Sequence, residues 1–241
     1  MNIDLHPLTI LLSLTLFLCG RFNYFIIIFI IILFHDLGHI LTMKLFNINI
    51  SKIRILPFGS IIISDIKYNE KSLIKFLIAI SGILFQIILF LIFNISFNIG
   101  FINHLTLNIF NKYNTFIIIF NLLPIVPLDG SKIIESVLEN IFYYKITIYL
   151  KNIISFVCLI VLLFYNSLSL DLLNILFISI YTSYEEILNI KFIYNKFLLE
   201  RYLYKYKYRK IKYVSNINKI YKNRLNFINN VSEEKILKNL K

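Results

Sequence analysis

The stretch HDLGH, residues 35–39, lies inside a long apolar segment that runs from about residue 22 to residue 46. Residues 22–34 carry no charge at all. Two histidines four apart lie on one face of a helix, one above the other. This spacing lets the imidazoles of His35 and His39 reach a single Zn²⁺. Because ionisable side chains at membrane depth are energetically costly, they mark a functional site.

The residue after the first histidine differs from the usual motif. The common pattern is His-Glu-x-x-His, and this sequence has Asp36 in place of the glutamate. A carboxylate at this position is where a general base for a zinc-activated water would lie. The alternative is a pair of polar residues hydrogen-bonded between helices, and a matching third ligand elsewhere would argue against it.

The composition is that of an integral membrane protein. The chain has 241 residues, of which 58% are hydrophobic and only 16% are charged, with a mean hydropathy of +0.75. Soluble domains carry about a quarter charged residues. The two cysteines, Cys19 and Cys158, lie in or beside apolar segments and form no readable disulfide framework or metal site.

The apolar segments predict an all-α, six-helix polytopic bundle. The expected membrane segments are residues 5–20, 22–46, 73–97, 114–128, 148–165 and 170–187. Residues 47–65 are rich in β-branched side chains and are interrupted at Pro57, Phe58, Gly59 and Ser60, which predicts a short β-hairpin or re-entrant element between the second and third helices. Such an element could offer an edge to an extended peptide.

The distribution of positive charge predicts the topology. If the N-terminus is cytoplasmic, then all 25 basic residues except Arg21 and Lys112 fall on the cytoplasmic side. This arrangement obeys the positive-inside rule, so both termini are expected in the cytoplasm.

The C-terminal part of the chain is polar and basic. In residues 201–213, RYLYKYKYRKIKY, aromatic and basic side chains alternate. A juxtamembrane basic segment favours contact with anionic lipid headgroups. Contacts with a peptide or a nucleotide are a weaker alternative, and no nucleic-acid partner is expected. We therefore divide the chain into a membrane domain, residues 1–187, and a basic cytoplasmic tail, residues 188–241.

A second polar motif supplies the missing ligand. Residues 121–130 read NLLPIVPLDG, and the acid Asp129 follows an otherwise apolar segment. Pro124 and Pro127 break the predicted fourth helix, because proline lacks a backbone N–H and clashes with the preceding turn. An acid after a broken helix is free to turn toward a metal, although alone it would be more typical of an Asp-Gly turn at the membrane surface. Two histidines and one carboxylate with an open fourth position are typical of a catalytic zinc site.

The two motifs together resemble the site-2 protease family of intramembrane zinc proteases, and most of all its sporulation branch. The resemblance covers roughly residues 1–200. It implies that His35, His39 and Asp129 bind one zinc ion and that Asp36 activates the water. The implied substrate is a membrane-associated sigma-factor precursor, with inhibitory membrane proteins as further partners. In a spore-former, the implied location is the mother-cell membrane around the forespore.

The expected roles of the remaining residues follow from this mechanism. Asn121 is a candidate donor to the substrate backbone or to the developing oxyanion. The region of Pro57, Phe58 and Gly59 is a candidate for holding the substrate as an added strand. Because Asp36 replaces the usual glutamate, a weakly active or inactive homologue that binds clients without cutting them is the main alternative. A metal transporter is disfavoured, because no inverted repeat is visible.

Overall fold

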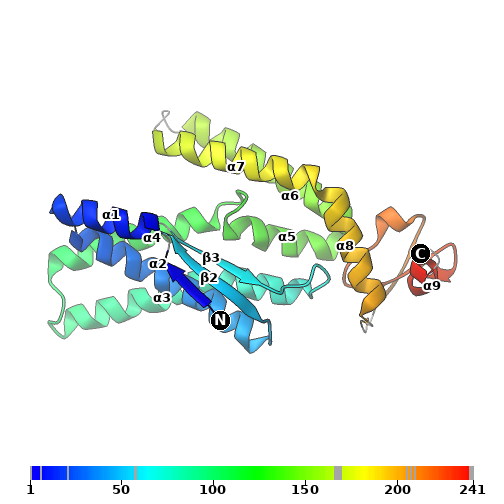
Figure 1. The fold of residues 1–241 in the computed structure, drawn as a ribbon, viewed down its shortest axis with the longest axis horizontal. Helices are drawn as coiled ribbons and strands as arrows, with labels where there is room; N and C mark the ends of the chain where they lie inside the picture. Colours follow the sequence, from blue (N-terminus) through cyan, green and yellow to red (C-terminus); the bar gives the residue numbers. More distant parts are fainter. Residues whose placement is uncertain are drawn as a thin grey trace. The chain divides into compact units, whose positions relative to one another are not determined.

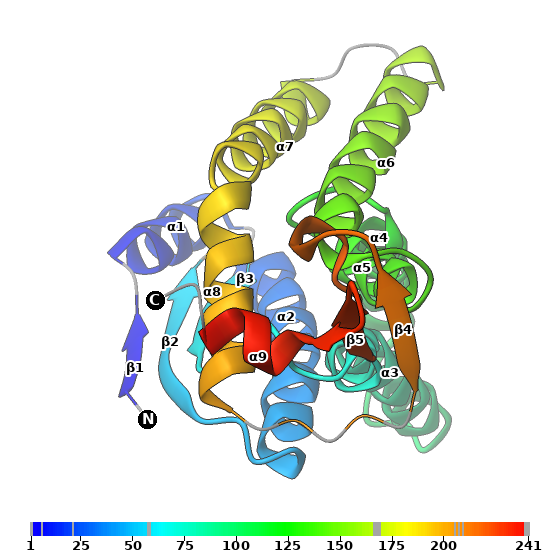
Figure 2. The ribbon, with the colours of Figure 1, turned by 90° about the vertical axis from the view of Figure 1, so that its right-hand side faces the viewer.

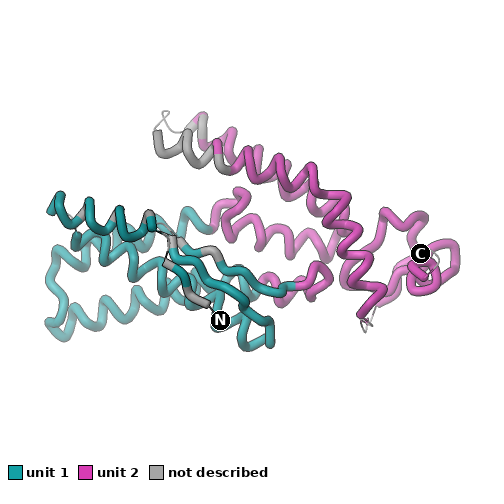
Figure 3. The backbone as a smooth tube through the Cα atoms, viewed as in Figure 1, with its two compact units in different colours: residues 1–66, 77–121 teal, residues 67–76, 122–241 magenta. Residues whose placement is uncertain are grey.

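A computed structural model describes residues 2–238 except 6, 21, 57–58, 166–169, 205, 207 and 209. The chain divides into two compact units, residues 1–66 with 77–121 and residues 67–76 with 122–241 (Figure 3). The long helix α3 contributes its first turn to the second unit and the rest of its length to the first. Helices dominate the structure, and two small sheets accompany them.

The first unit combines helices with a short sheet (Figure 1). Its elements are β1 (Asn2–Leu5), α1 (Pro7–Leu18), α2 (Phe22–Leu45), β2 (Ile50–Leu56), β3 (Gly59–Ser64), α3 (Ser72–Asn98) and α4 (His104–Leu122). Residues of α2, α3 and α4 form one buried apolar core, which includes Ile31, Leu89 and Phe110. This core lies next to the histidine pair on α2 and ties the helix to its neighbours.

The predicted hairpin is present. Strands β2 and β3 pair in antiparallel fashion, with Ile53 opposite Ile62, and Gly59 opens β3 opposite Leu56. A strand that the sequence did not predict, β1, pairs with β2 in parallel and completes a three-stranded sheet in the order β1-β2-β3. Four residues at the chain start carry too short a pattern to signal a strand.

Helices α2 and α3 end with the same hydrogen-bond pattern. After α2, the N–H groups of Asn47 and Ile48 donate to the carbonyls of Lys44 and Met43, and Asn47 has a φ of 55°. After α3, Gly100 takes the same left-handed conformation with a φ of 88°. Both ends are Schellman motifs, which satisfy the last free carbonyls of a helix.

The fourth predicted segment is interrupted in the structure. Helix α4 ends at Leu122, and both Pro124 and Pro127 lie in the non-helical connection that follows. The helix begins at His104, ten residues before the predicted start. Asp129 does not end this segment, as the sequence suggested, but opens a new amphipathic helix, α5 (Asp129–Ile141).

The second unit continues from α5 into the C-terminal region. Its further elements are α6 (Tyr144–Tyr165), α7 (Leu170–Leu188), α8 (Ile190–Leu203), β4 (Ile211–Val214), a 3₁₀ turn (Ile217–Lys219), β5 (Leu225–Ile228), β6 (Val231–Ser232) and α9 (Glu233–Lys238). Strand β4 is parallel to β5, and β5 is antiparallel to β6. Figure 2 shows α9 beside α8 and β5, in agreement with their contacts.

The basic tail is folded rather than an extended linker. Tyr144 of α6 packs with Tyr194 and Phe197 of α8 and with Ile220 of the tail in one buried core. Arg201 donates to the carbonyl of Lys222 and forms a buried ion pair with Glu233. The all-α expectation is therefore wrong in detail, because this region contains a second small sheet. The division into a membrane domain, residues 1–187, and a cytoplasmic tail, residues 188–241, stays a prediction.

Three described helices are long and apolar enough to cross a membrane. They are Phe22–Leu45, Ser72–Asn98 and Tyr144–Leu162. They fall within the second, third and fifth predicted segments or overlap them closely. Helix α1, with 12 residues, is shorter than a regular crossing requires. The structure supports a membrane protein, and the predicted number of six crossings stays a prediction.

Candidate metal centre

The two histidines of the HDLGH motif lie one turn apart on α2, and both are buried. Their Nε2 atoms are 3.0 Å apart, and the rings meet edge to face at 81°. The i, i+4 spacing produces this arrangement, because side chains four residues apart stack on one face of a helix. Two imidazole nitrogens are thereby directed at one small volume.

The second nitrogen of each ring faces an oxygen atom. Nδ1 of His39 lies 2.7 Å from the backbone carbonyl of Ile78, and Nδ1 of His35 lies 3.1 Å from Oε1 of Gln86. Both oxygens are acceptors, so each Nδ1 carries the proton as the donor. In the neutral ring the lone pair then resides on Nε2. Both Nε2 atoms are therefore poised as ligands, as in metal sites where an outer oxygen fixes the tautomer.

Two glycines let α3 approach the histidines closely. A Cβ added to Gly82 would lie 2.6 Å from Cε1 of His35 and 2.7 Å from Nε2 of His39. A Cβ added to Gly38 would lie 2.5 Å from the carbonyl oxygen of Ser81. Small residues permit such close crossings of membrane helices. Glycine at position 82 thus leaves room for the two rings and the space in front of them.

Asp129 is held by a tight local structure at the start of α5. The N–H of Leu128 donates to Ile125, and the N–H of Val126 donates to the Ser155 hydroxyl. A Cβ at Gly130 would lie 2.2 Å from the carbonyl oxygen of Leu123, so the lack of space requires glycine at position 130. The first turn of a helix favours a negative charge.

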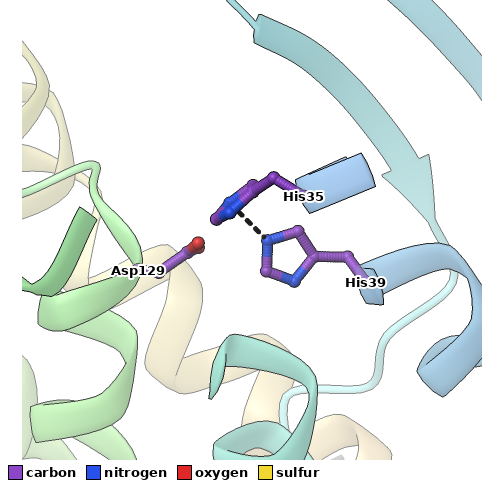
Figure 4. Close-up of side chains that lie close together, drawn as sticks. All are labelled: His35, His39 and Asp129. Carbon is purple, nitrogen blue, oxygen red and sulfur yellow. Dashed lines mark hydrogen bonds between the residues drawn. The ribbon is translucent and has the colours of Figure 1, made fainter. Parts of the chain in front are cut away.

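The three predicted ligands come together in the structure. His35, His39 and Asp129 each offer one ligand atom, all within 4.8 Å of one another, and all three residues are buried (Figure 4). Figure 4 shows the Asp129 carboxylate directed toward the two imidazoles. Two neutral imidazole nitrogens and one carboxylate oxygen are the donor set of a catalytic zinc site with an open position. The residues present therefore fit a zinc ion.

The other predicted site residues have more varied settings. Asp36 is buried on α2, and it is three residues from His39 and so on a neighbouring face of the helix. Asn121 is half-buried in the last turn of α4. Gly59 is the first residue of β3, whereas Pro57 and Phe58 lie outside the described residues. The functional roles assigned to these five residues stay predictions.

Three partners of the site among the described residues were not predicted as functional: Lys132, Gln86 and the carbonyl of Ile78. Lys132, one turn after Asp129, lies 2.8 Å from its Oδ1. Gln86 faces His35. It is the only glutamine in the sequence and is surrounded by apolar residues, which was the available signal. The Ile78 carbonyl leaves no signal in the sequence, because every residue has one.

A membrane helix that carries two histidines with fixed tautomers, together with a nearby carboxylate, defines a zinc metallopeptidase embedded in the membrane. The sequence matches the profile of Peptidase family M50 over residues 23–105 and 96–165. The chain belongs to this family. It is a zinc metalloendopeptidase of the site-2 protease type.

Individual relatives agree with the family. The chain is 29% identical over 208 residues to stage IV sporulation protein FB of Bacillus subtilis, covering 84% of this chain and 72% of the relative. It is 32% identical over 156 residues to a zinc metalloprotease of Methanocaldococcus jannaschii, covering 63% of this chain and 45% of the relative. The solved site-2 protease from Methanocaldococcus jannaschii shares the fold, with a TM-score of 0.52 and 24% identity over 78% of this chain and 88% of that one.

Proposed function

We propose that this enzyme cuts a membrane-associated sigma-factor precursor near its N-terminal pro-sequence. The observation that carries the proposal is the convergence of His35, His39 and Asp129, in a chain similar over most of its length to a sporulation protein of Bacillus subtilis. The sporulation branch of the family implies this substrate class. The enzyme activity itself follows from the family and does not depend on the client.

In the proposed mechanism the three ligands hold one zinc ion. Zinc, when bound, lowers the pKa of a coordinated water toward about 7 and polarises a scissile carbonyl. The Asp36 carboxylate accepts a proton from the attacking water and passes it to the leaving amine. The Nδ1–H groups of both histidines stay hydrogen-bonded throughout, so that the rings keep their orientation.

Substrate binding is assigned to the two polar breaks in the apolar sequence. The amide of Asn121 donates to the substrate backbone or to the developing oxyanion. Residues 57–59, together with β3, hold the substrate as an added strand. β3 supports this role because it is an outer strand of its sheet among the described residues.

The proposed topology has six crossings with both termini in the cytoplasm. The positive-inside distribution supports it. Inhibitory membrane proteins and anionic lipid headgroups are the proposed partners besides the client. Reporter fusions at Gly100, between α3 and α4, and after residue 241 should report opposite sides of the membrane; the same side for both would refute this topology.

Co-expression with the sigma-factor precursor from the same genome tests the proposed client. A shortened product is expected with the wild-type enzyme and none with His35→Ala. A precursor that stays intact beside a zinc-loaded wild-type enzyme would remove this client, while leaving the metalloprotease assignment in place.

The alternative is a homologue that binds clients without cutting them. It is not favoured, because Asp36 keeps the carboxylate that water activation needs and the metal ligands are complete. Cleavage of any client by the purified enzyme excludes it.

A further inference from the structure

The side chain of Gln86 is isolated in an apolar environment. It is completely buried on α3, and every residue from Ile87 to Ile92 is apolar. A buried polar side chain in a membrane helix is costly unless it is used. Its amide nitrogen has no hydrogen-bond partner among the described residues, whereas its oxygen accepts from His35.

The two histidines are held in different ways. Nδ1 of His39 faces the main-chain carbonyl of Ile78, and every side chain at position 78 would supply that acceptor. Nδ1 of His35 faces a side-chain oxygen, Oε1 of Gln86, at 3.1 Å. Substitution can therefore remove the acceptor of His35 but not that of His39.

The consequence concerns which nitrogen of His35 holds the proton. With the Gln86 oxygen in place, Nδ1 must donate and the lone pair lies on Nε2, 3.0 Å from Nε2 of His39. Without that oxygen, the proton can move to Nε2 and be donated to His39 instead. The ring would then be locked in a form that cannot bind metal through the nitrogen facing the site.

We propose that Gln86 is a positioning residue that holds His35 in its metal-binding tautomer and orientation. This inference rests on the proposed role of His35 as a zinc ligand. Gln86 is assigned no direct bond to zinc or substrate. Its contribution passes through one hydrogen bond, from Nδ1 of His35 to Oε1 of Gln86.

The test measures zinc affinity of the purified full-length protein by competition with a chelator. Loss of an outer hydrogen bond to a metal-binding histidine typically weakens affinity about 10–100-fold, and we expect a loss in this range for Gln86→Leu. Gln86→Glu should retain near wild-type affinity, because a carboxylate accepts the same hydrogen bond. A merely structural role predicts the reverse order, since a buried carboxylate is harder to accommodate than leucine.

Asn114 provides a matched control. It is as deeply buried as Gln86, and its amide donates to the backbone carbonyl of Gln86 at 3.4 Å, not to an imidazole. Asn114→Leu should leave zinc affinity within about 2-fold of wild type. Cobalt substitution adds a spectroscopic readout, because an altered ligand field in Gln86→Leu reports a displaced His35.

Three outcomes would overturn the proposal: unchanged zinc affinity in Gln86→Leu, an equal loss in Asn114→Leu, or a loss in Gln86→Glu as large as that in Gln86→Leu. Failure of the underlying zinc site looks different. In that case the wild-type protein binds no zinc, or His35→Ala binds it as tightly as wild type.

Discussion

Nε2 of His35 lies 3.0 Å from Nε2 of His39, and the opposite nitrogen of each ring faces an oxygen of α3. Both imidazoles therefore present Nε2 to the same small volume, as a zinc ion bound by both rings requires. Because both Nε2 atoms face this volume, the two histidines define the candidate metal centre together with Asp129.

Zinc content is the first prediction. The wild-type protein should hold one zinc per chain, and His35→Ala, His39→Ala and Asp129→Ala should each lose most of it, because each removes one of three ligands. His104→Ala is the matched control, since His104 is exposed at the start of α4. Full zinc occupancy in the double histidine variant would contradict the site.

The second prediction concerns Asp36. Asp36→Asn should slow cleavage by about 10²–10⁴-fold, the usual contribution of a general base. Zinc should remain bound, because the ligands are untouched. Asp36→Glu should cleave at least as fast as wild type, since aspartate is one methylene shorter than the family residue and a misplacement of about 1 Å can cost on the order of 100-fold. Rate and zinc content are measured on the same preparations. If Asp36→Asn cleaves at the wild-type rate, Asp36 is not the base.

Glu139 gives the third prediction, on stability. Both oxygens of this buried α5 carboxylate accept hydrogen bonds from Nζ of Lys222, each at 2.8 Å. The carboxylate also contacts Lys75 and Ser72. Below a pH of about 7, where Lys222 is charged, Glu139→Gln leaves this buried lysine without its counter-charge, which typically costs about 3–5 kcal/mol. The thermal unfolding midpoint in detergent should fall, and residues 211–238 should become less protected from protease. Lys210→Met, at an exposed position, should change neither.

The fourth prediction is a pH dependence of that contact. Burial, together with the charge of Lys75, lowers the pKa of Lys222 to about 7 from its ordinary 10.5. Between these values the unfolded chain binds more protons than the folded one, so stability should rise as pH increases from about 7 toward 10.5. The measurement is the unfolding midpoint across this range. Lys222→Met should flatten the rise, and an equally steep rise in that variant would assign it to another group.

The cluster of candidate ligands could be predicted because its signals are local. The spacing of His35 and His39 and the prolines before Asp129 are visible without knowledge of the packing. The roles of Gln86 and Ile78 depend instead on how α2 and α3 cross at Gly38 and Gly82, which no sequence period encodes.

The folded tail escaped prediction for a related reason. Its strands have four residues or fewer, which is too short for a clear alternation. Its stability comes from distant contacts, such as those of Arg201 with Glu233 and of Lys222 with Glu139. The alternating aromatic and basic residues suggested a surface segment, and several of them are in fact partly buried.

The most direct test of the central claim is cleavage by the purified enzyme, reconstituted in liposomes with the sigma-factor precursor from the same genome. The wild-type protein should release a shortened product, a chelator should stop the reaction, and added zinc should restore it. The His35→Ala/His39→Ala variant should yield no product under any of these conditions. Cleavage that persists in that variant, or that is indifferent to zinc removal, would contradict the account.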